Sequence, residues 1–114
     1  MRDDRERLQD ILDSIDQIEK YAVRGFDAFS QDELIQVWFT RHLQAIGEAA
    51  RSLSPNLTSK YPKVPWGEII GLRNVLVHNY FEVDQEVVWG IIQDDLPPLK
   101  KQVEAILRQE SEGT

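Results

Sequence analysis

Apolar residues recur at every third or fourth position along most of this chain, and this spacing restricts the fold more than any other feature. In the first 25 residues the pattern comprises Leu8, Ile11, Leu12, Ile15, Ile18 and Ala22, with acidic residues between them. An α-helix has about 3.6 residues per turn, so side chains at this spacing share one face. The segment is therefore predicted to be an amphipathic helix that ends at Gly25.

A second helix is predicted from Ser30 to Leu53. Ser30 followed three residues later by Glu33 matches a capping box, which favours a helix start at Ser30. The small residues of this helix would let another helix approach closely; they are Ala45, Gly47, Ala49 and Ala50. The next stretch, "SPNLTSKYPKVP", holds three of the five prolines and is predicted to be extended and irregular.

The third helix is predicted to begin at Pro65 and to contain "GLRNVLVHNYF", residues 71–81. Asp84 is a suitable N-cap for a fourth helix. The buried stripe of that helix is predicted to be Val87, Val88, Ile91 and Ile92. The sequence "DLPP" is predicted to break or kink it. A last helical stretch follows with Leu99, Val103, Ile106 and Leu107, and the tail "RQESEGT" is predicted to fray.

No segment shows the alternation of a strand. The predicted fold is all-α: one domain over residues 1–114, built as an up-and-down bundle of four to five helices. Short chains of this kind with apolar stripes left over often pair, so a homodimer is predicted.

Charge is unevenly distributed along the chain. The net charge is −7, but residues 1–34 carry −5, residues 35–81 carry +3 and residues 82–114 carry −5. A basic middle on an acidic chain is compatible with a local anion or phosphate site, although scattered charge on solvated helix faces explains it equally well. The chain has no cysteine and no apolar run long enough for a membrane span, and its first residues, "MRDDRERLQD", are charged and lack the apolar stretch of a signal peptide. We therefore expect a soluble cytoplasmic protein.

The segment 71–81 places four polar side chains among its apolar residues: Arg73, Asn74, His78 and Tyr80. On an ideal helix Arg73 and Tyr80 nearly align, whereas Arg73 and His78 lie about 140° apart and would meet only if the helix loosens or a groove joins them. Arginine grips phosphate, histidine moves protons near neutral pH and asparagine can orient the imidazole, a set that suits phosphodiester cleavage. Judged by residue type alone, an arginine, a histidine and a tyrosine near a helix end are more often hydrogen-bonded groups at the surface or at an interface than catalytic residues.

The ordered motif in "IGLRNVLVHNYFEVD" resembles the Arg, four residues, His, one residue, Tyr motif of the HepT toxins in the HEPN ribonuclease superfamily. The similarity extends over most of the chain, through "AIGEAARSLSP", "YPKVPWGEIIGLRN" and "VVWGIIQDDLPPLKKQVEAIL". The resemblance implies a helical homodimer whose two motifs line a shared cleft and act as a metal-independent ribonuclease and toxin.

The resemblance also implies roles for individual residues. Arg73 and His78 would be the catalytic pair, Asn74 a supporting residue in substrate binding, and Tyr80 the residue that a MntA-type nucleotidyltransferase antitoxin adenylylates. An RNA endonuclease toxin is therefore the leading hypothesis. A non-catalytic helical subunit that binds nucleotide or substrate for a nucleotidyltransferase is the alternative, and a plain dimerisation bundle is the third.

Other polar and aromatic residues fit structural roles better. His42 is interpreted as a packed or interface histidine, and Trp66 and Trp89 as core or dimer anchors rather than base-stacking platforms. Glu48 could pair with a cation of the motif, or make a structural contact. Asp94 and Asp95 have no further ligand at a suitable spacing, so neither a metal nor another cofactor is predicted.

Overall fold

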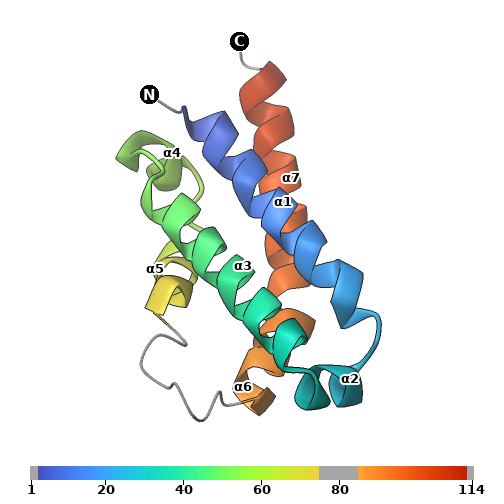
Figure 1. Cartoon of the computed structure of the whole chain (residues 1–114). Helices are drawn as coiled ribbons and strands as arrows, with labels where there is room; N and C mark the ends of the chain where they lie inside the picture. Colours follow the sequence, from blue (N-terminus) through green and yellow to red (C-terminus); the bar gives the residue numbers. More distant parts are fainter. Residues whose placement is uncertain (1–2, 75–84, 113–114) are drawn as a thin grey trace.

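The computed structural model describes residues 3–74 and 85–112 (Figure 1). Within these ranges the regular structure is entirely helical, which confirms the all-α prediction. The helices are α1 (Asp4–Ala22), α2 (Phe26–Gln31), α3 (Glu33–Arg51), α4 (Pro55–Lys60), α5 (Trp66–Gly71), the 3-10 helix η1 (Leu72–Asn74), α6 (Gln85–Gly90), the π-helical η2 (Ile91–Asp95) and α7 (Leu96–Glu112).

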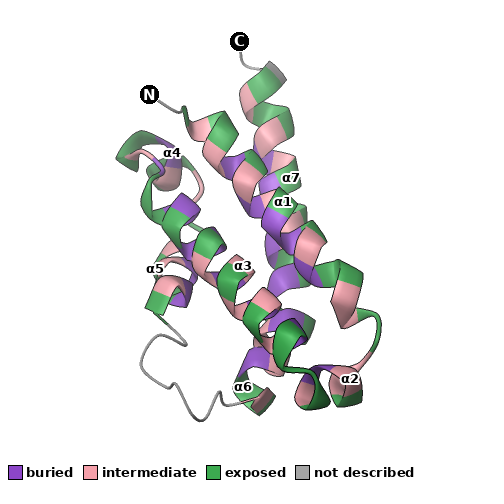
Figure 2. Ribbon diagram, in the orientation of Figure 1, coloured by how far each residue is buried: buried purple, intermediate pink, exposed green. Residues whose placement is uncertain are grey.

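Three long helices form the body of the bundle. Helix α1 packs against both α3 and α7 and runs antiparallel to them, so the start of α1 and the end of α7 lie at one end of the molecule (Figure 1). The buried stripes of these helices meet in the centre (Figure 2). They supply Leu8, Ile11, Ile15 and Ile18 from α1, Phe39, Leu43 and Ile46 from α3, and Leu99, Val103 and Ile106 from α7.

The first connection differs from the prediction. Helix α1 ends at Ala22, three residues before the predicted end at Gly25. The φ of +90° at Gly25 favours glycine, and Gly25 is the N-cap residue of the short helix α2 that follows. Ser30 lies inside α2 and its hydroxyl donates to the carbonyl of Asp27, so the capping box predicted at Ser30 is wrong. Asp32 caps α3 instead, because its carboxylate accepts the backbone N–H of Leu34 at 2.9 Å.

The segment predicted to be extended after α3 also contains a helix. Ser54 caps α4, since its hydroxyl accepts the N–H of Leu57 at 3.2 Å, and Pro55 occupies the first turn, where its missing N–H costs nothing. The same Ser54 hydroxyl donates to Asp4 at 2.6 Å. This long-range bond ties α4 to the start of α1, which a pattern of local breakers could not predict.

The prolines of "DLPP" do not end the helix. Gly90 and Leu96 both have α-helical dihedrals, so α6, η2 and α7 follow one another without an extended residue. Pro97 and Pro98 fall in the first turn of α7, after the π-helical η2 has rearranged the hydrogen bonds. The prediction of a buried Val87 is wrong, because this side chain is 51% exposed, whereas Val88 is fully buried.

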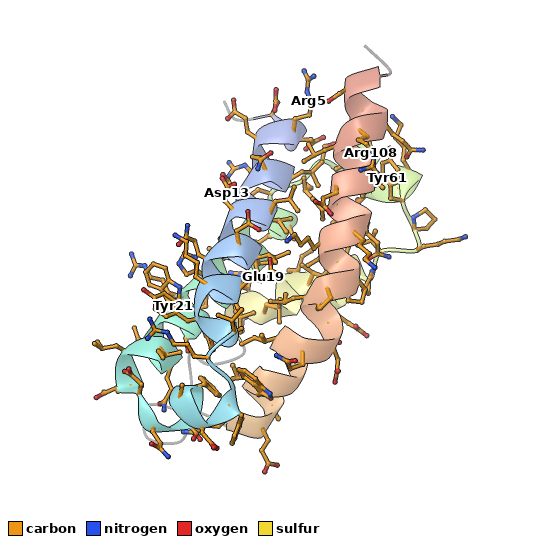
Figure 3. All side chains as sticks on the ribbon, turned by 90° about the vertical axis from the view of Figure 1, so that its right-hand side faces the viewer. Arg5, Asp13, Glu19, Tyr21, Tyr61 and Arg108 are labelled. Carbon is orange, nitrogen blue, oxygen red and sulfur yellow. The ribbon has the colours of Figure 1, made fainter. Side chains whose placement is uncertain are left out.

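The C-terminal stretch was predicted to fray, but α7 continues to Glu112. Tyr61 donates its hydroxyl to Glu110 at 2.6 Å and Lys60 lies 3.3 Å from the same carboxylate, so this end of α7 is bonded to the end of α4. Figure 3 shows Tyr61 beside this part of α7. Among the described residues, no helix is long and apolar enough to cross a membrane.

Candidate functional site

The segment that begins the polar motif is short. Helix α5 ends at Gly71, and Leu72, Arg73 and Asn74 form the 3-10 helix η1. Pro65 precedes α5 as its N-cap residue rather than as its first helical residue. Leu72 is buried, Arg73 is half-buried and Asn74 is exposed. The motif arginine and its neighbour therefore sit on a tighter turn than the ideal α-helix assumed from the sequence.

Helix α3 supports η1 through a glycine. A Cβ atom added at Gly47 would lie 3.0 Å from both Cα and Cβ of Arg73 and closer still to the Arg73 backbone nitrogen. These contacts are too close for a methyl group, so η1 can occupy this position only because residue 47 has no side chain. The predicted use of small residues on α3 for close approach is confirmed here.

The neighbouring residue on α3 pairs with the arginine. Oε1 of Glu48 lies 2.8 Å from Nε of Arg73. The N–H of this buried Nε is not aligned on the carboxylate well enough for a hydrogen bond, so the contact is an ion pair. The Arg73 side chain is 32% exposed and that of Glu48 54%. Of the two alternatives left open for Glu48, the structure shows the pairing with a cation of the motif, Arg73.

A second arginine shares the same carboxylate. Nη1 of Arg51 lies 3.8 Å from Oε2 of Glu48, and both side chains are more than half exposed. One carboxylate thus stands between two guanidinium groups, and the cluster of Arg51, Glu48 and Arg73 carries one excess positive charge. Sequence reasoning did not single out Arg51. The net positive charge of residues 35–81 indicated a basic region, but it did not indicate which of the basic side chains lie close together in the fold.

The other two motif residues, His78 and Tyr80, lie outside the described residues, as does the predicted N-cap Asp84. Their predicted roles stay predictions. Of the predicted site residues, the structure places Arg73 against Glu48 and Asn74 next to it at the surface.

The other singled-out residues have structural surroundings. The His42 ring lies 4.5 Å from that of Trp38, and burial, together with nearby Arg41, lowers the pKa of His42 below 6.5. Trp89 stacks on Phe29 at 5.7 Å. Trp66 packs against the core and donates its ring N–H to the carbonyl of Tyr61. These contacts confirm the interpretation of all three as packed residues.

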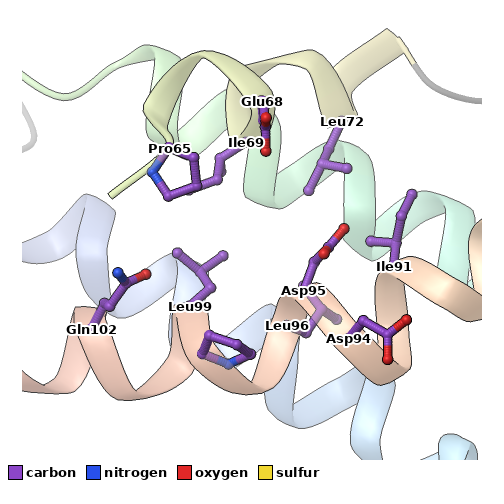
Figure 4. A pocket seen from close by; sticks show the side chains of 11 residues that line it. Pro65, Glu68, Ile69, Leu72, Ile91, Asp94, Asp95, Leu96, Leu99 and Gln102 are labelled. Atoms are coloured by element: carbon purple, nitrogen blue, oxygen red, sulfur yellow. The ribbon is translucent and has the colours of Figure 1, made fainter. Parts of the chain in front are cut away.

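A cavity of about 210 Å³ lies between α5 on one side and η2 with the start of α7 on the other (Figure 4). Its walls include the apolar side chains of Ile69, Leu72 and Leu99, while Glu68, Asp94 and Asp95 supply carboxylates. The cavity lies close to the arginine cluster in sequence, because Leu72 in its wall directly precedes Arg73. The cavity is acidic and the cluster is basic, so the cavity is not suited to phosphate.

These features define a class of protein, an all-helical bundle in which a half-buried arginine on a short turn is docked against a long helix. The model of the family described as Ribonuclease HepT-like matches residues 11–106. The chain belongs to this HepT-like family. No solved structure matches the chain.

Relatives match the chain over almost its whole length. The chain is 37% identical over 106 residues to "Putative RNase MJ1380" of Methanocaldococcus jannaschii, covering 92% of this chain and 97% of that one. It is 38% identical over 111 residues to "Putative RNase TTE0752" of Caldanaerobacter subterraneus, covering 96% and 99%. It is 33% identical over 106 residues to "Probable ribonuclease HepT" of Thermococcus cleftensis, covering 92% and 96%.

Proposed function

We propose that this protein is a metal-independent RNA endonuclease and the toxin of a toxin–antitoxin pair. The observation that carries the proposal is the arginine cluster on α3 and η1, in a chain that belongs to the HepT-like ribonuclease family. The names of the relatives support RNA cleavage. A guanidinium held at the surface, with a second one nearby, suits the binding of a phosphodiester.

In this proposal Arg73 binds the scissile phosphate and stabilises the charge that builds on its non-bridging oxygens. His78 takes the proton of the ribose 2′-hydroxyl, and the 2′-oxygen attacks phosphorus. The bond to the 5′-oxygen breaks, and that oxygen receives a proton from a second acid. The products are a 2′,3′-cyclic phosphate and a 5′-hydroxyl, and the reaction consumes no water and no cofactor.

The reaction needs one group that accepts a proton and another that donates one, which suggests two copies of the chain. One chain offers a single motif histidine, and the second His78 of a homodimer would supply the acid if both motifs face one cleft. Light scattering after size-exclusion chromatography tests the assembly. A monomer that cleaves RNA at full rate would contradict this part of the proposal.

The nuclease activity is tested with purified protein, a labelled RNA and an excess of chelator. We expect cleavage to persist in chelator and to fall at least about a hundredfold in Arg73→Ala and in His78→Ala. Arg108→Ala is the matched control, because Arg108 is an exposed arginine on α7, outside the cluster. Near-normal cleavage by His78→Ala, or a strict need for Mg²⁺, would reject the mechanism. A wild-type protein that cleaves no RNA but binds a nucleotidyltransferase would favour the non-catalytic role.

We further propose that a MntA-type nucleotidyltransferase silences the nuclease by joining AMP to the hydroxyl of Tyr80. The new phosphodiester would add a negative charge and a bulky nucleotide close to the residues that bind the substrate phosphate. The charge could pair with Arg73, so the modified tyrosine would compete with RNA by both charge and volume.

Mass spectrometry tests this regulation. Incubation with the partner enzyme, ATP and Mg²⁺ should add one or more AMP units to Tyr80, and Tyr80→Phe should escape the modification and stay active. Tyr61 and Tyr21 are internal controls, since the Tyr61 hydroxyl is bonded to Glu110 and the Tyr21 ring lies beneath Arg24. Adenylylation mapped to either of them, or no gain in mass, would refute the proposal.

A further inference from the structure

We infer that Gly47 and Glu48 are positioning residues for Arg73. Gly47 sets where the backbone of Arg73 lies, and Glu48 sets how its guanidinium is turned. The functional meaning of this inference rests on the proposed role of Arg73 in binding phosphate. The placement itself rests on two independent contacts that α3 makes with the same residue, one steric and one electrostatic.

The steric contact fixes the backbone. Because the space beside Gly47 is filled by the backbone of Arg73, any side chain at position 47 has to move η1 away from α3. Backbone atoms cannot rotate aside as the end of a long side chain can. A shift of η1 would carry the guanidinium with it, and catalytic groups lose activity when they are displaced by about 1 Å.

The electrostatic contact fixes the orientation. A guanidinium has one N–H donor on Nε and four on its two Nη atoms. Glu48 takes the Nε side of Arg73, and Nε is buried. A phosphate that binds Arg73 in a bidentate manner is therefore expected to use the two Nη groups. Without Glu48, the guanidinium could present either edge, and fewer molecules would hold the productive one.

Glu48 should have opposite effects on binding and on cleavage. Its negative charge repels RNA, while its ion pair keeps Arg73 in the orientation that stabilises the transition state. Glu48→Gln keeps the shape and removes the charge. We expect RNA to bind at least as tightly to this variant and the single-turnover cleavage rate to fall about tenfold. A residue that only supported the fold would not combine a lower rate with unchanged or tighter binding.

The experiment measures cleavage in the active protein and RNA affinity in the His78→Ala background, where the RNA stays intact. Glu68→Gln is the matched control, because Glu68 is an exposed residue of α5, carries the same charge as Glu48 and lines the cavity rather than facing Arg73. Glu48→Asp, which keeps the charge, should recover part of the rate. Wild-type cleavage by Glu48→Gln would overturn the inference, as would a rate loss matched by weaker binding.

Gly47→Ala tests the steric contact, with Gly71→Ala as its control. A Cβ at Gly71 meets nothing within 4 Å, so alanine there should leave cleavage unchanged, while Gly47→Ala should lower it at least about tenfold. Equal rates in the two alanine variants would overturn the role of Gly47. Should Gly47→Ala fail to fold, Glu48→Gln still decides the orientation of Arg73.

A spectroscopic measurement separates this inference from the proposed function. Nε of Arg73 is buried beside Glu48, so its proton should exchange slowly with water in the wild type and faster in Glu48→Gln, where the guanidinium can turn. Nuclear magnetic resonance spectra measure this exchange, and Arg73→Lys assigns the signal. An unchanged signal would overturn the positioning role even if RNA is cleaved. A wild-type protein that cleaves no RNA would reject the proposed function, and the signal would still decide whether Glu48 holds Arg73.

Discussion

The long helices and the segment α5–η1 are held in place in different ways. Helices α1, α3 and α7 share a continuous apolar core, whereas α5 and η1 offer two buried apolar side chains, Ile69 and Leu72. Besides the buried Leu72, η1 is held against α3 by one backbone contact at Gly47 and one ion pair at Glu48. Apolar burial gives the bundle its stability, while the candidate site depends on a few contacts that are specific in geometry and small in energy.

The largest effect is expected from a cavity in the shared core. Leu43 is fully buried on α3, so Leu43→Ala should lower the free energy of unfolding by about 2–5 kcal/mol. Leu34→Ala is the control on the same helix, because Leu34 is 79% exposed and its loss should change stability by less than about 0.5 kcal/mol. Urea denaturation measures both variants. Equal effects would show that the long helices do not rely on this core.

A smaller effect should distinguish the two regions directly. We expect the backbone amides of α5 to exchange with solvent through local openings that require at least about 1.4 kcal/mol less free energy than unfolding of the whole bundle. Amides in the middle of α3 should exchange only through global unfolding. Native-state hydrogen exchange at increasing urea concentrations measures both. Identical opening free energies would mean that α5 and the long helices form one cooperative unit.

The smallest effect concerns the contact that joins α4 to α7. The hydrogen bond from Tyr61 lowers the pKa of Glu110 below 4.5, with desolvation opposing it and Lys60 assisting. A lowered carboxyl pKa gives stability that is complete above 4.5 and is lost as the pH falls through the folded-state pKa. Tyr61→Phe should therefore destabilise the protein more at pH 7 than at pH 3.

Urea denaturation at the two pH values checks this prediction, with Tyr21→Phe as the control. Tyr21 packs against Trp38 at 5.6 Å rather than bonding to a carboxylate, so its substitution should have the same effect at both pH values. A Tyr61→Phe effect that does not depend on pH would show that the Glu110 contact contributes no measurable stability.

The sequence by itself determined the helical class, the buried faces of α1 and α7, and the family. Side chains at three-and-four spacing share one face of a helix, so residues such as Ile11, Ile15 and Val103 could be assigned to the core without a structure. The motif around Arg73 was recognisable because its order of residues is distinctive. The short helices α2 and α4 were missed, because the contacts that hold them come from distant parts of the chain. Helix α2 buries Phe29 and accepts a hydrogen bond from Gln85, while Ser54, the cap of α4, is bonded to Asp4.

Only the tertiary structure decided what surrounds Arg73. Gly47 and Glu48 precede Arg73 by about 25 residues, and no local pattern predicts that one makes room for its backbone and the other faces its Nε. Periodicity records which face of a helix is buried, since burial follows from side-chain polarity along one element. It does not record which backbone atoms of another element lie against that face, because this depends on how the helices pack together.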